Sequence, residues 1–227
     1  MIDADNILRQ ISEYTALWCP AVGEETDLAA MAQYAIAQKN TIISAAPDSV
    51  AKLWPWLEGS GVAIYARFYL NGDKNGPYEE RISDLTARIN TVFKQGASGA
   101  QVFVKLSDLE LFVSQLHLIR DDLFFNKTLT IGLDINDIGP YDWADVFGNL
   151  KKIQAASLLL AMPRDTGDKS DFVGRLYGAM DMWDNGFRGD LHFALGQNFI
   201  RIDQAFRLVQ EMRPKLQNGL KFFITKA

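Results

Sequence analysis

The chain has 227 residues, and its composition excludes several classes of protein. A hydrophobic fraction of 48% is enough for a large core, so the composition excludes an intrinsically disordered chain. The net charge is −5 and the basic residues are scattered, which argues against nucleic acid or an anionic membrane as the main partner. A small anionic ligand stays open, because a few local donors outweigh a weak overall field.

Cysteines and histidines are too few for a thiolate cluster or a multi-histidine metal site. Cys19 is the single cysteine, and the two histidines are His117 and His192. We therefore expect no disulfide within the chain, no metal and no cofactor. The acidic start of the sequence lacks the features of a signal peptide, and no apolar run approaches the roughly 20 residues of a membrane span. We expect a cytoplasmic protein.

Eight short β-rich runs recur along the chain, separated by segments with the 3.6-residue period of amphipathic helices. The predicted strands are Tyr14–Trp18, Thr41–Ala45, Val62–Tyr69, Gln101–Lys105, Thr128–Ile135, Ser157–Met162, Leu191–Leu195 and Leu220–Thr225. The predicted helices are 26–38, 48–57, 78–95, 108–124, 141–153, 170–185 and 199–213, with an extra helix at 3–12.

This alternation predicts a parallel sheet, and eight strands are the number that closes into a (β/α)₈ TIM barrel. No linker or change of composition marks a boundary, so residues 1–227 are expected to form a single domain. The extra N-terminal helix is expected to plug the barrel's N-terminal end. An open, flavodoxin-like sheet is the alternative.

The fifth predicted strand favours the barrel. Its alternate residues from Thr128 to Asn136 are small or polar, whereas the residues between them, from Leu129 to Ile135, are leucine or isoleucine. An open doubly wound sheet is usually apolar on both faces. In a barrel the apolar face meets the helices, and the inner face can carry polar groups that rise toward the active end.

Two helix starts carry capping signals. Ser107 and Glu110 have the spacing of a capping box, in which each side chain accepts a hydrogen bond from the other residue's backbone N–H. Asp48, directly after Pro47, is expected to cap the second helix of the strand–helix repeat.

Catalytic groups of TIM barrels lie at the C-terminal ends of the strands, which narrows the candidates to the strand ends. Lys105 ends the fourth strand, where an inward side chain beside an apolar wall would have a lowered pKa and could attack carbonyls. The alternative is a lysine that extends into solvent. Asp134 ends the fifth strand and could act as general acid or base beside Lys105, or else bond its own loop.

The remaining candidates would bind the substrate. Gly196, Gln197 and Asn198 precede a helix, whose N-terminal amides can hold an anion, and Thr225 and Lys226 follow the last strand. Arg67 and Arg164 could each bind a carboxylate or phosphate, or form a structural pair with an acid, and Asn136 shares the face of the fifth strand with the polar groups below it.

Several other residues are interpreted as structural. His192 lies within a strand and is expected to be buried and hydrogen-bonded, and His117 is expected to pack in an apolar helix. Cys19 is expected to be an inert buried thiol. The same core or helix–helix role is expected for the tryptophans that fall on helices, Trp54, Trp56, Trp143 and Trp183.

Short segments spread over most of the chain resemble the deoxyribose-phosphate aldolase family. A strand ending before Pro47 is followed by a helix and by Gly59-Ser-Gly-Val62, which opens the next strand. The other matching segments are Thr41–Val50, Tyr69–Gly72, Glu24–Leu28, Lys127–Leu129 and Ile200–Ala205.

The resemblance implies a class I aldolase, in which a lysine on strand six forms a Schiff base and a lysine on strand seven lowers its pKa. Alignment places Leu160 and Ala194 at these positions and puts the strand-four acid among Val102, Phe103 and Val104. The strand-five acid corresponds to Asp134, and the phosphate-binding glycine pair to Gly196 followed by Gln197. Neither leucine nor alanine can form an imine, so the family's mechanism cannot run unchanged.

Three hypotheses for function follow. The first is a divergent aldolase-superfamily barrel, a lyase or related enzyme, that acts on a small carbonyl or phosphorylated sugar-like substrate, with Lys105 as nucleophile or electrostatic aid and Asp134 as acid or base. The second is an inactive barrel that serves as a binding or interaction protein. The third is a sugar-phosphate isomerase or epimerase. The expected partner is a small molecule, with neither nucleic acid nor membrane, and a homo-oligomer stays open.

Overall fold

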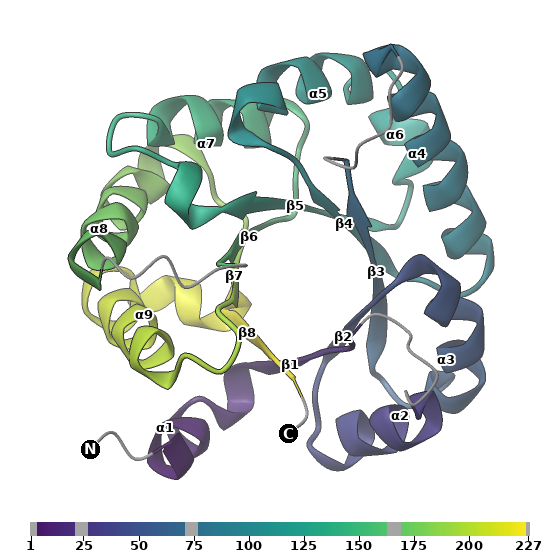
Figure 1. Cartoon of the computed structure of the whole chain (residues 1–227), viewed down its shortest axis with the longest axis horizontal. Coiled ribbons are helices and arrows are strands. Elements are labelled where there is room, and N and C mark those ends of the chain that lie inside the picture. The colour runs from purple at the N-terminus through teal and green to yellow at the C-terminus, as the bar shows by residue number, and fades with distance from the viewer. Residues whose placement is uncertain (1–3, 21–26, 71–76, 163–168, 226–227) are drawn as a thin grey trace.

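The computed structural model describes residues 4–20, 27–70, 77–162 and 169–225, and these form a closed barrel of eight parallel strands in sequential order (Figure 1). The strands are β1 (Thr15–Trp18), β2 (Ile42–Ala45), β3 (Ala63–Tyr69), β4 (Gly99–Phe103), β5 (Thr128–Asp134), β6 (Ser157–Ala161), β7 (Asp190–Ala194) and β8 (Lys221–Ile224). β1 pairs with both β2 and β8, so no strand edge is left open. The predicted barrel is confirmed, and the open sheet is excluded.

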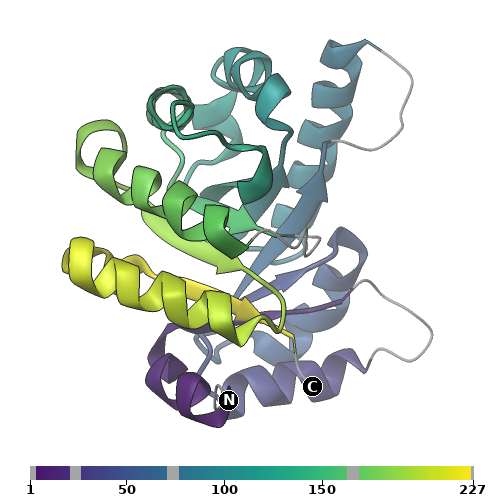
Figure 2. The ribbon, with the colours of Figure 1, turned by 60° about the vertical axis from the view of Figure 1, so that its left-hand side comes forward.

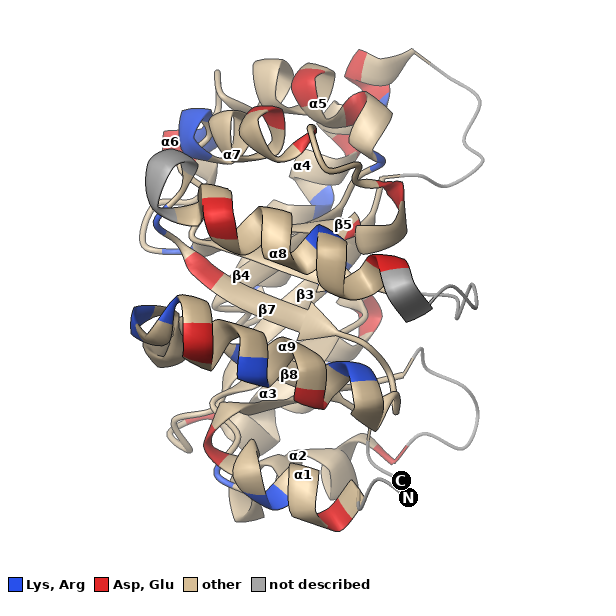
Figure 3. Ribbon diagram, turned by 90° about the vertical axis from the view of Figure 1, so that its left-hand side faces the viewer, with Lys and Arg blue, Asp and Glu red and all other residues tan. Residues whose placement is uncertain are grey.

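Helices surround the barrel. They are α1 (Ala4–Gln10), α2 (Leu28–Ala37), α3 (Val50–Leu57), α4 (Tyr78–Lys94), α5 (Leu109–Leu116), α6 (Arg120–Leu123), α7 (Trp143–Lys152), α8 (Lys169–Gly186) and α9 (Phe199–Met212). Figure 2 shows α8 and α9 packed side by side on one flank of the barrel. In Figure 3, acidic and basic positions are interspersed along both of these helices. Among the described residues, no helix is both long and apolar enough to span a membrane.

The N-terminal helix lies on the outside of the barrel, so the prediction that it would plug the barrel's end is wrong. α1 packs against α9, and in Figure 1 it stands beside the ring rather than across its opening. Ile7 and Ile11 bury their side chains in the layer between strands and helices. The apolar face of α1 therefore extends the outer layer of the core.

Three other local predictions are corrected. The helix predicted over 108–124 is two helices, α5 and α6, separated at 117–119. Ser107 and Glu110 form no capping box, because a 3₁₀ turn over Leu106–Asp108 precedes α5 and the Ser107 hydroxyl donates to Asp108 instead. Asp48 likewise lies inside a 3₁₀ turn, so it does not cap α3.

The strands separate two layers of side chains, as the pattern of the fifth strand predicts. Leu129, Ile131 and Leu133 of β5 face the helices and belong to the main apolar core. Gly132 lies on the opposite face, where its partner in the β4–β5 register is Phe103 of the barrel interior. Residues paired across neighbouring strands point to the same face of the sheet. Starting from Gly132 and Phe103, the pairing therefore identifies the inward-facing residues of every other strand.

Two residues predicted to be buried are instead exposed. His117 follows the last residue of α5 and is exposed, because the helix ends before its ring can reach the core. Trp56 is 51% exposed on α3, whereas Trp143 and Trp183 are buried and Trp54 packs against the core. Cys19 is buried as expected, with its thiol 3.5 Å from the Met31 sulfur, and burial raises the pKa of the thiol.

His192 lies inside the barrel on β7 and is buried, as predicted. Its Nδ1 has no hydrogen-bond partner among the described residues, so the expected bond to that nitrogen is not formed. Burial, and secondarily the positive charge of Lys221, lower the pKa of His192 from 6.5 to about 3. The imidazole of the folded protein is therefore neutral.

This neutral histidine predicts a pH dependence of stability. Between pH 6.5 and about 3 only the unfolded chain takes up the His192 proton, so the free energy of unfolding should fall as the pH falls through this window. The contribution is at most about 1.4 kcal/mol per pH unit. Urea unfolding of His192→Leu across this window should show a shallower loss than the wild type, whereas His117→Gln, at the exposed histidine, should keep the wild-type slope. Equal slopes for His192→Leu and the wild type would contradict the prediction.

Candidate functional site

A cavity of about 690 Å³ opens at the C-terminal ends of the strands, where barrel chemistry takes place. Most of its wall is apolar and aromatic, and its described charged groups are Lys105, Asp134 and Asp137. The lining residues are Trp18, Tyr69, Phe103, Val104, Lys105, Asp134, Asp137, Ala161, Met162, Ala194, Gly196, Phe223 and Thr225. Trp18 and Phe103 thus form part of the cavity wall and leave the cavity open.

Asp134 lies where the sequence predicts, at the end of β5 and on the cavity wall. The side chain is half-buried, and this burial raises the pKa of its carboxyl group above the ordinary value. The backbone N–H of Asn136 donates to Oδ1 at 2.9 Å, which partly opposes the rise. The carboxyl group thus bonds its own loop and also faces the cavity, so its loop contact is confirmed and its role as acid or base stays a prediction.

Asp137 is a second acid of this wall that the sequence analysis did not select. It lines the cavity three residues after Asp134, at the end of the 3₁₀ turn Ile135–Asp137, and its charge raises the pKa of Asp134 further. The turn begins where β5 ends, so the strand alternation stops there. Asn136, which also belongs to this turn, does not line the cavity, and its backbone N–H donates to the Asp134 carboxyl group.

Arg175 of α8 fixes the loop that carries the two acids. Its Nη1 donates to the carbonyls of Asn136 at 2.6 Å and Ile138 at 2.7 Å, and more weakly to that of Ile135 at 3.3 Å. The same guanidinium forms an ion pair with Asp171 one helical turn earlier. A single planar cation therefore ties the acid loop to α8, and its charge lowers the pKa of Asp134.

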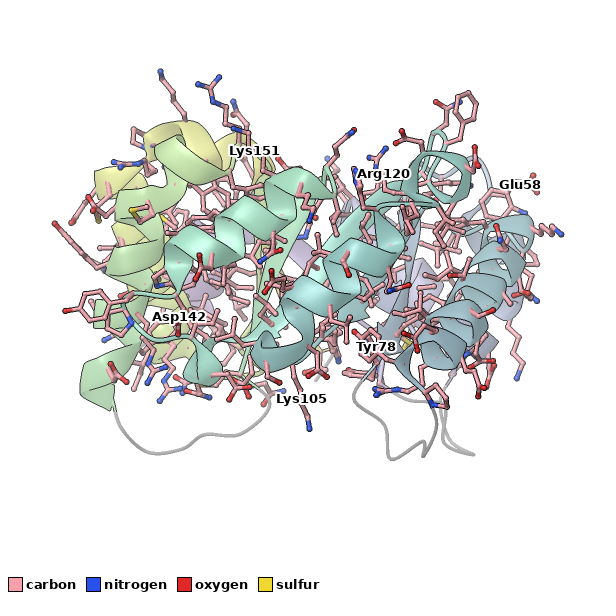
Figure 4. The ribbon with its side chains drawn as sticks, turned by 90° about the horizontal axis from the view of Figure 1, so that it is seen from above. Glu58, Tyr78, Lys105, Arg120, Asp142 and Lys151 are labelled. Carbon is pink, nitrogen blue, oxygen red and sulfur yellow. The ribbon has the colours of Figure 1, made fainter. Side chains whose placement is uncertain are left out.

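Lys105 lines the cavity but stands above the barrel rim. β4 ends at Phe103, two residues earlier than predicted, and Lys105 is exposed at the start of the next 3₁₀ turn. In Figure 4 its side chain points away from the ribbon. The apolar wall that would surround an inward amine therefore lies below it, and the structure agrees with the solvent-directed alternative.

Only some of the residues predicted to bind an anion line the cavity. Gly196, with a φ of 61°, and Thr225 both line the cavity. Gln197 is exposed, and the Asn198 side chain caps α9 by accepting from the backbone N–H of Arg201 at 3.2 Å. Arg164 and Lys226 lie outside the described residues.

Arg67 lies under the floor of the cavity and does not line it. It is only 5% exposed, and its guanidinium donates to Ser44 Oγ at 3.1 Å and to the Cys19 carbonyl at 2.7 Å. The Trp18 ring covers it, with the guanidinium carbon 3.9 Å from the ring centroid. Burial lowers the pKa of Arg67. The expected ion pair with an acid is not present among the described residues, and neutral acceptors take its place.

The two strand positions aligned with the aldolase lysines differ in direction. Ala194 of β7 lines the cavity, as the alignment requires. Leu160 of β6 faces the helices and is fully buried in the outer layer, so it is not at the mouth. Its neighbours Leu159 and Ala161 are the residues of β6 that face inward at this height. Neither inward residue can form an imine.

No protein-family model matches the sequence, and a search of curated proteins gave no match. Solved structures match over nearly the whole chain. A Toxoplasma gondii protein provisionally named deoxyribose-phosphate aldolase is 13% identical, with a TM-score of 0.69, over 98% of this chain and 91% of its own.

The tetrameric deoxyribose phosphate aldolase of Aeropyrum pernix is 14% identical, with a TM-score of 0.66, over 99% of this chain and 94% of its own. An oxaloacetate acetylhydrolase bound to oxalate is 14% identical, with a TM-score of 0.58, over 98% of this chain and 80% of its own. At such low identity the likeness establishes the fold alone, which is the barrel that these enzymes share.

Proposed function

We propose that this barrel is an enzyme of the lyase type that forms or cleaves a carbon–carbon bond next to the carbonyl group of a small molecule. The observation that carries the proposal is Asp134, a half-buried carboxyl group with a raised pKa on the wall of a cavity at the catalytic end of the barrel. A carboxyl group whose pKa is raised by burial, at the wall of such a cavity, is suited to accept and return a proton, which is the step that such reactions need.

In the cleavage direction, the Asp134 carboxylate accepts the proton of a hydroxyl group β to the carbonyl. The bond between the α and β carbons breaks, the hydroxyl carbon becomes an aldehyde, and the electron pair moves onto the former carbonyl as an enolate. Protonation of that enolate at carbon completes the reaction, and Asp134 can return the proton it accepted. No oxidant or reductant is consumed.

We propose that Lys105 assists as a charge and not as a nucleophile. Its ammonium group at the rim can stabilise the enolate oxygen, whereas its side chain extends away from the barrel interior, where a Schiff base with a bound carbonyl would form. Borohydride reduction with an aldehyde should therefore label Lys105 no faster than Lys151, which is also exposed and lies on α7. Mass spectrometry of the peptides measures the two adducts. Selective labelling of Lys105 would overturn the electrostatic role and favour the imine.

The function itself is tested by turnover. Thermal-shift screening of aldehydes and sugar phosphates selects ligands, and NMR then follows cleavage of the corresponding β-hydroxy carbonyl compounds. We expect aldehyde to appear, and the loss of this activity in Asp134→Asn. If ligands raise the melting temperature but neither cleavage nor exchange of α-protons is seen, the chain is a binding protein and the proposal is overturned. Exchange without cleavage would point to an isomerase.

We also propose that the chain assembles with itself. The Aeropyrum pernix aldolase that shares this fold is tetrameric. Light scattering after size-exclusion chromatography should give a mass above that of one chain, and a monomer at all accessible concentrations would refute the assembly.

A further inference from the structure

Four aromatic side chains from four different strands form one continuous wall of the cavity. They are Trp18 of β1, Tyr69 of β3, Phe103 of β4 and Phe223 of β8. Phe103 stacks on Tyr69 with centroids 4.9 Å apart, and Trp18 meets Phe103 and Phe223 edge to face at 6.1 and 5.9 Å. The contacts join all four rings, so the wall is a single aromatic surface.

Phe103 at the centre of this wall depends on a glycine. Gly132 is its neighbour in the β4–β5 register, and a Cβ atom at position 132 would come within 2.6 Å of the Phe103 ring. The ring therefore lies against the bare backbone of β5, with Tyr69 stacked on it. This packing keeps the Phe103 ring close to the barrel wall and leaves the cavity open beside it.

Trp18 is fixed from below by a buried polar chain. Arg67 lies against the ring, and Ser44, which receives a hydrogen bond from Arg67, donates in turn to Gln101 Oε1 at 2.5 Å. These groups are all buried. Arg67 is thus a positioning residue for the indole ring. The aromatic wall is preformed, which reduces the entropy lost when a flat ligand binds.

The charged groups facing this wall argue against a phosphorylated ligand. Among the described lining residues there are two carboxylates, Asp134 and Asp137, and one ammonium group, Lys105. A phosphate dianion would be repelled by the acids, and the hydroxyl groups of a sugar would find few polar partners along the aromatic wall. A flat apolar group would instead bury surface and stack on the rings.

We infer that the substrate is a carbonyl compound with an uncharged aryl or conjugated apolar group, which packs against Trp18 and Tyr69, the two rings of this wall that are not buried, while its carbonyl faces Asp134. This inference rests on the proposed function and narrows it from small carbonyl compounds in general to one class. The aldehyde product would then be an aryl aldehyde of the benzaldehyde type.

The test is ligand binding, measured by calorimetry or NMR titration on the full chain. Benzaldehyde should bind at least about tenfold more tightly than glyceraldehyde 3-phosphate, a difference in binding free energy of about 1.4 kcal/mol. Phe103→Leu keeps the apolar bulk and removes the ring. This variant should lower the affinity for benzaldehyde at least about tenfold, which is again about 1.4 kcal/mol of binding free energy. Phe125→Ala, at an exposed phenylalanine before β5, is the matched control and should leave affinity unchanged.

The outcomes separate this inference from the proposed function. Tighter binding of the phosphorylated aldehyde, or unchanged benzaldehyde affinity in a folded Phe103→Leu variant, would overturn the aryl substrate even if the enzyme cleaves other carbonyl compounds. Ring-dependent benzaldehyde binding with no turnover of any β-hydroxy carbonyl compound would keep the aryl site and overturn the lyase. Gly132→Ala gives a second check, because it should displace the Phe103 ring and weaken benzaldehyde without removing any aromatic group.

Discussion

Asp134→Asn is expected to lower kcat at least about 100-fold, the lower end of what a positioned general acid or base contributes. Asparagine keeps the shape of the side chain and an oxygen that can accept from the backbone N–H of Asn136, so the loop should stay folded. It cannot take up the substrate proton. Steady-state kinetics on the β-hydroxy carbonyl substrate measures the loss, and circular dichroism checks the fold.

Two charged neighbours of Asp134 provide controls, because they shift its pKa in opposite directions. Asp137 raises the pKa of Asp134 and Arg175 lowers it. Because the proposed mechanism uses the Asp134 carboxylate as the base, kcat/KM should rise with pH through the Asp134 pKa. Asp137→Asn should move this rise to lower pH, and Arg175→Met should move it to higher pH. An unchanged profile in both variants, or a kcat for Asp134→Asn within a few-fold of the wild type, would remove Asp134 from the mechanism.

Phe147→Ala is expected to lower the free energy of unfolding by about 3–5 kcal/mol, the usual cost of emptying a buried phenylalanine site. Phe147 of α7 is fully buried, and its ring contacts Trp143, Trp183 and Phe187 at centroid distances of 5.5, 5.2 and 6.1 Å. These aromatic residues join α7 to α8 and to the segment that precedes β7, so a cavity there weakens the outer layer.

Urea unfolding followed by fluorescence measures this loss. Phe125→Ala removes an equally large ring that is 76% exposed, and it should change the free energy by no more than about 0.5 kcal/mol. If the two variants were equally stable, the aromatic cluster would not be part of the stabilising core. The cluster lies in the outer layer, so ligand affinity at the cavity should change little in the folded Phe147→Ala protein.

The barrel could be predicted from sequence because its main signals are local. Along Thr128–Asp134 the side chains alternate between small or polar and large apolar, and a strand converts that alternation directly into two faces. The position of α1 had no such signal. Its apolar residues could cover any apolar surface, and only the assembled barrel shows that the available surface is beside α9.

For the candidate site, the sequence predicted which side chains face the barrel interior, but not how far along the barrel axis they lie. Alternation correctly placed Asp134 inside, yet for Lys105 what matters is the end of β4, and a two-residue difference puts the amine above the rim. Arg67 shows a second limit. Its place on an inward face follows from the pattern, whereas the Trp18 ring that covers it comes from another strand. The spacing of Asp134 and Asp137 was visible, but the 3₁₀ turn that brings Asp137 to the wall was not.

The pairing of β1 with β8 also has a consequence for how the chain folds. Thr15 lies opposite Phe222, so almost the entire sequence separates two strands that must meet. During synthesis the edge of β1 stays without this partner until the final strand leaves the ribosome, and the barrel cannot close before then. Closing so long a loop costs little more entropy than closing one of half its length, but contacts this distant in sequence form slowly. Ring closure is thus expected to be the late event of folding.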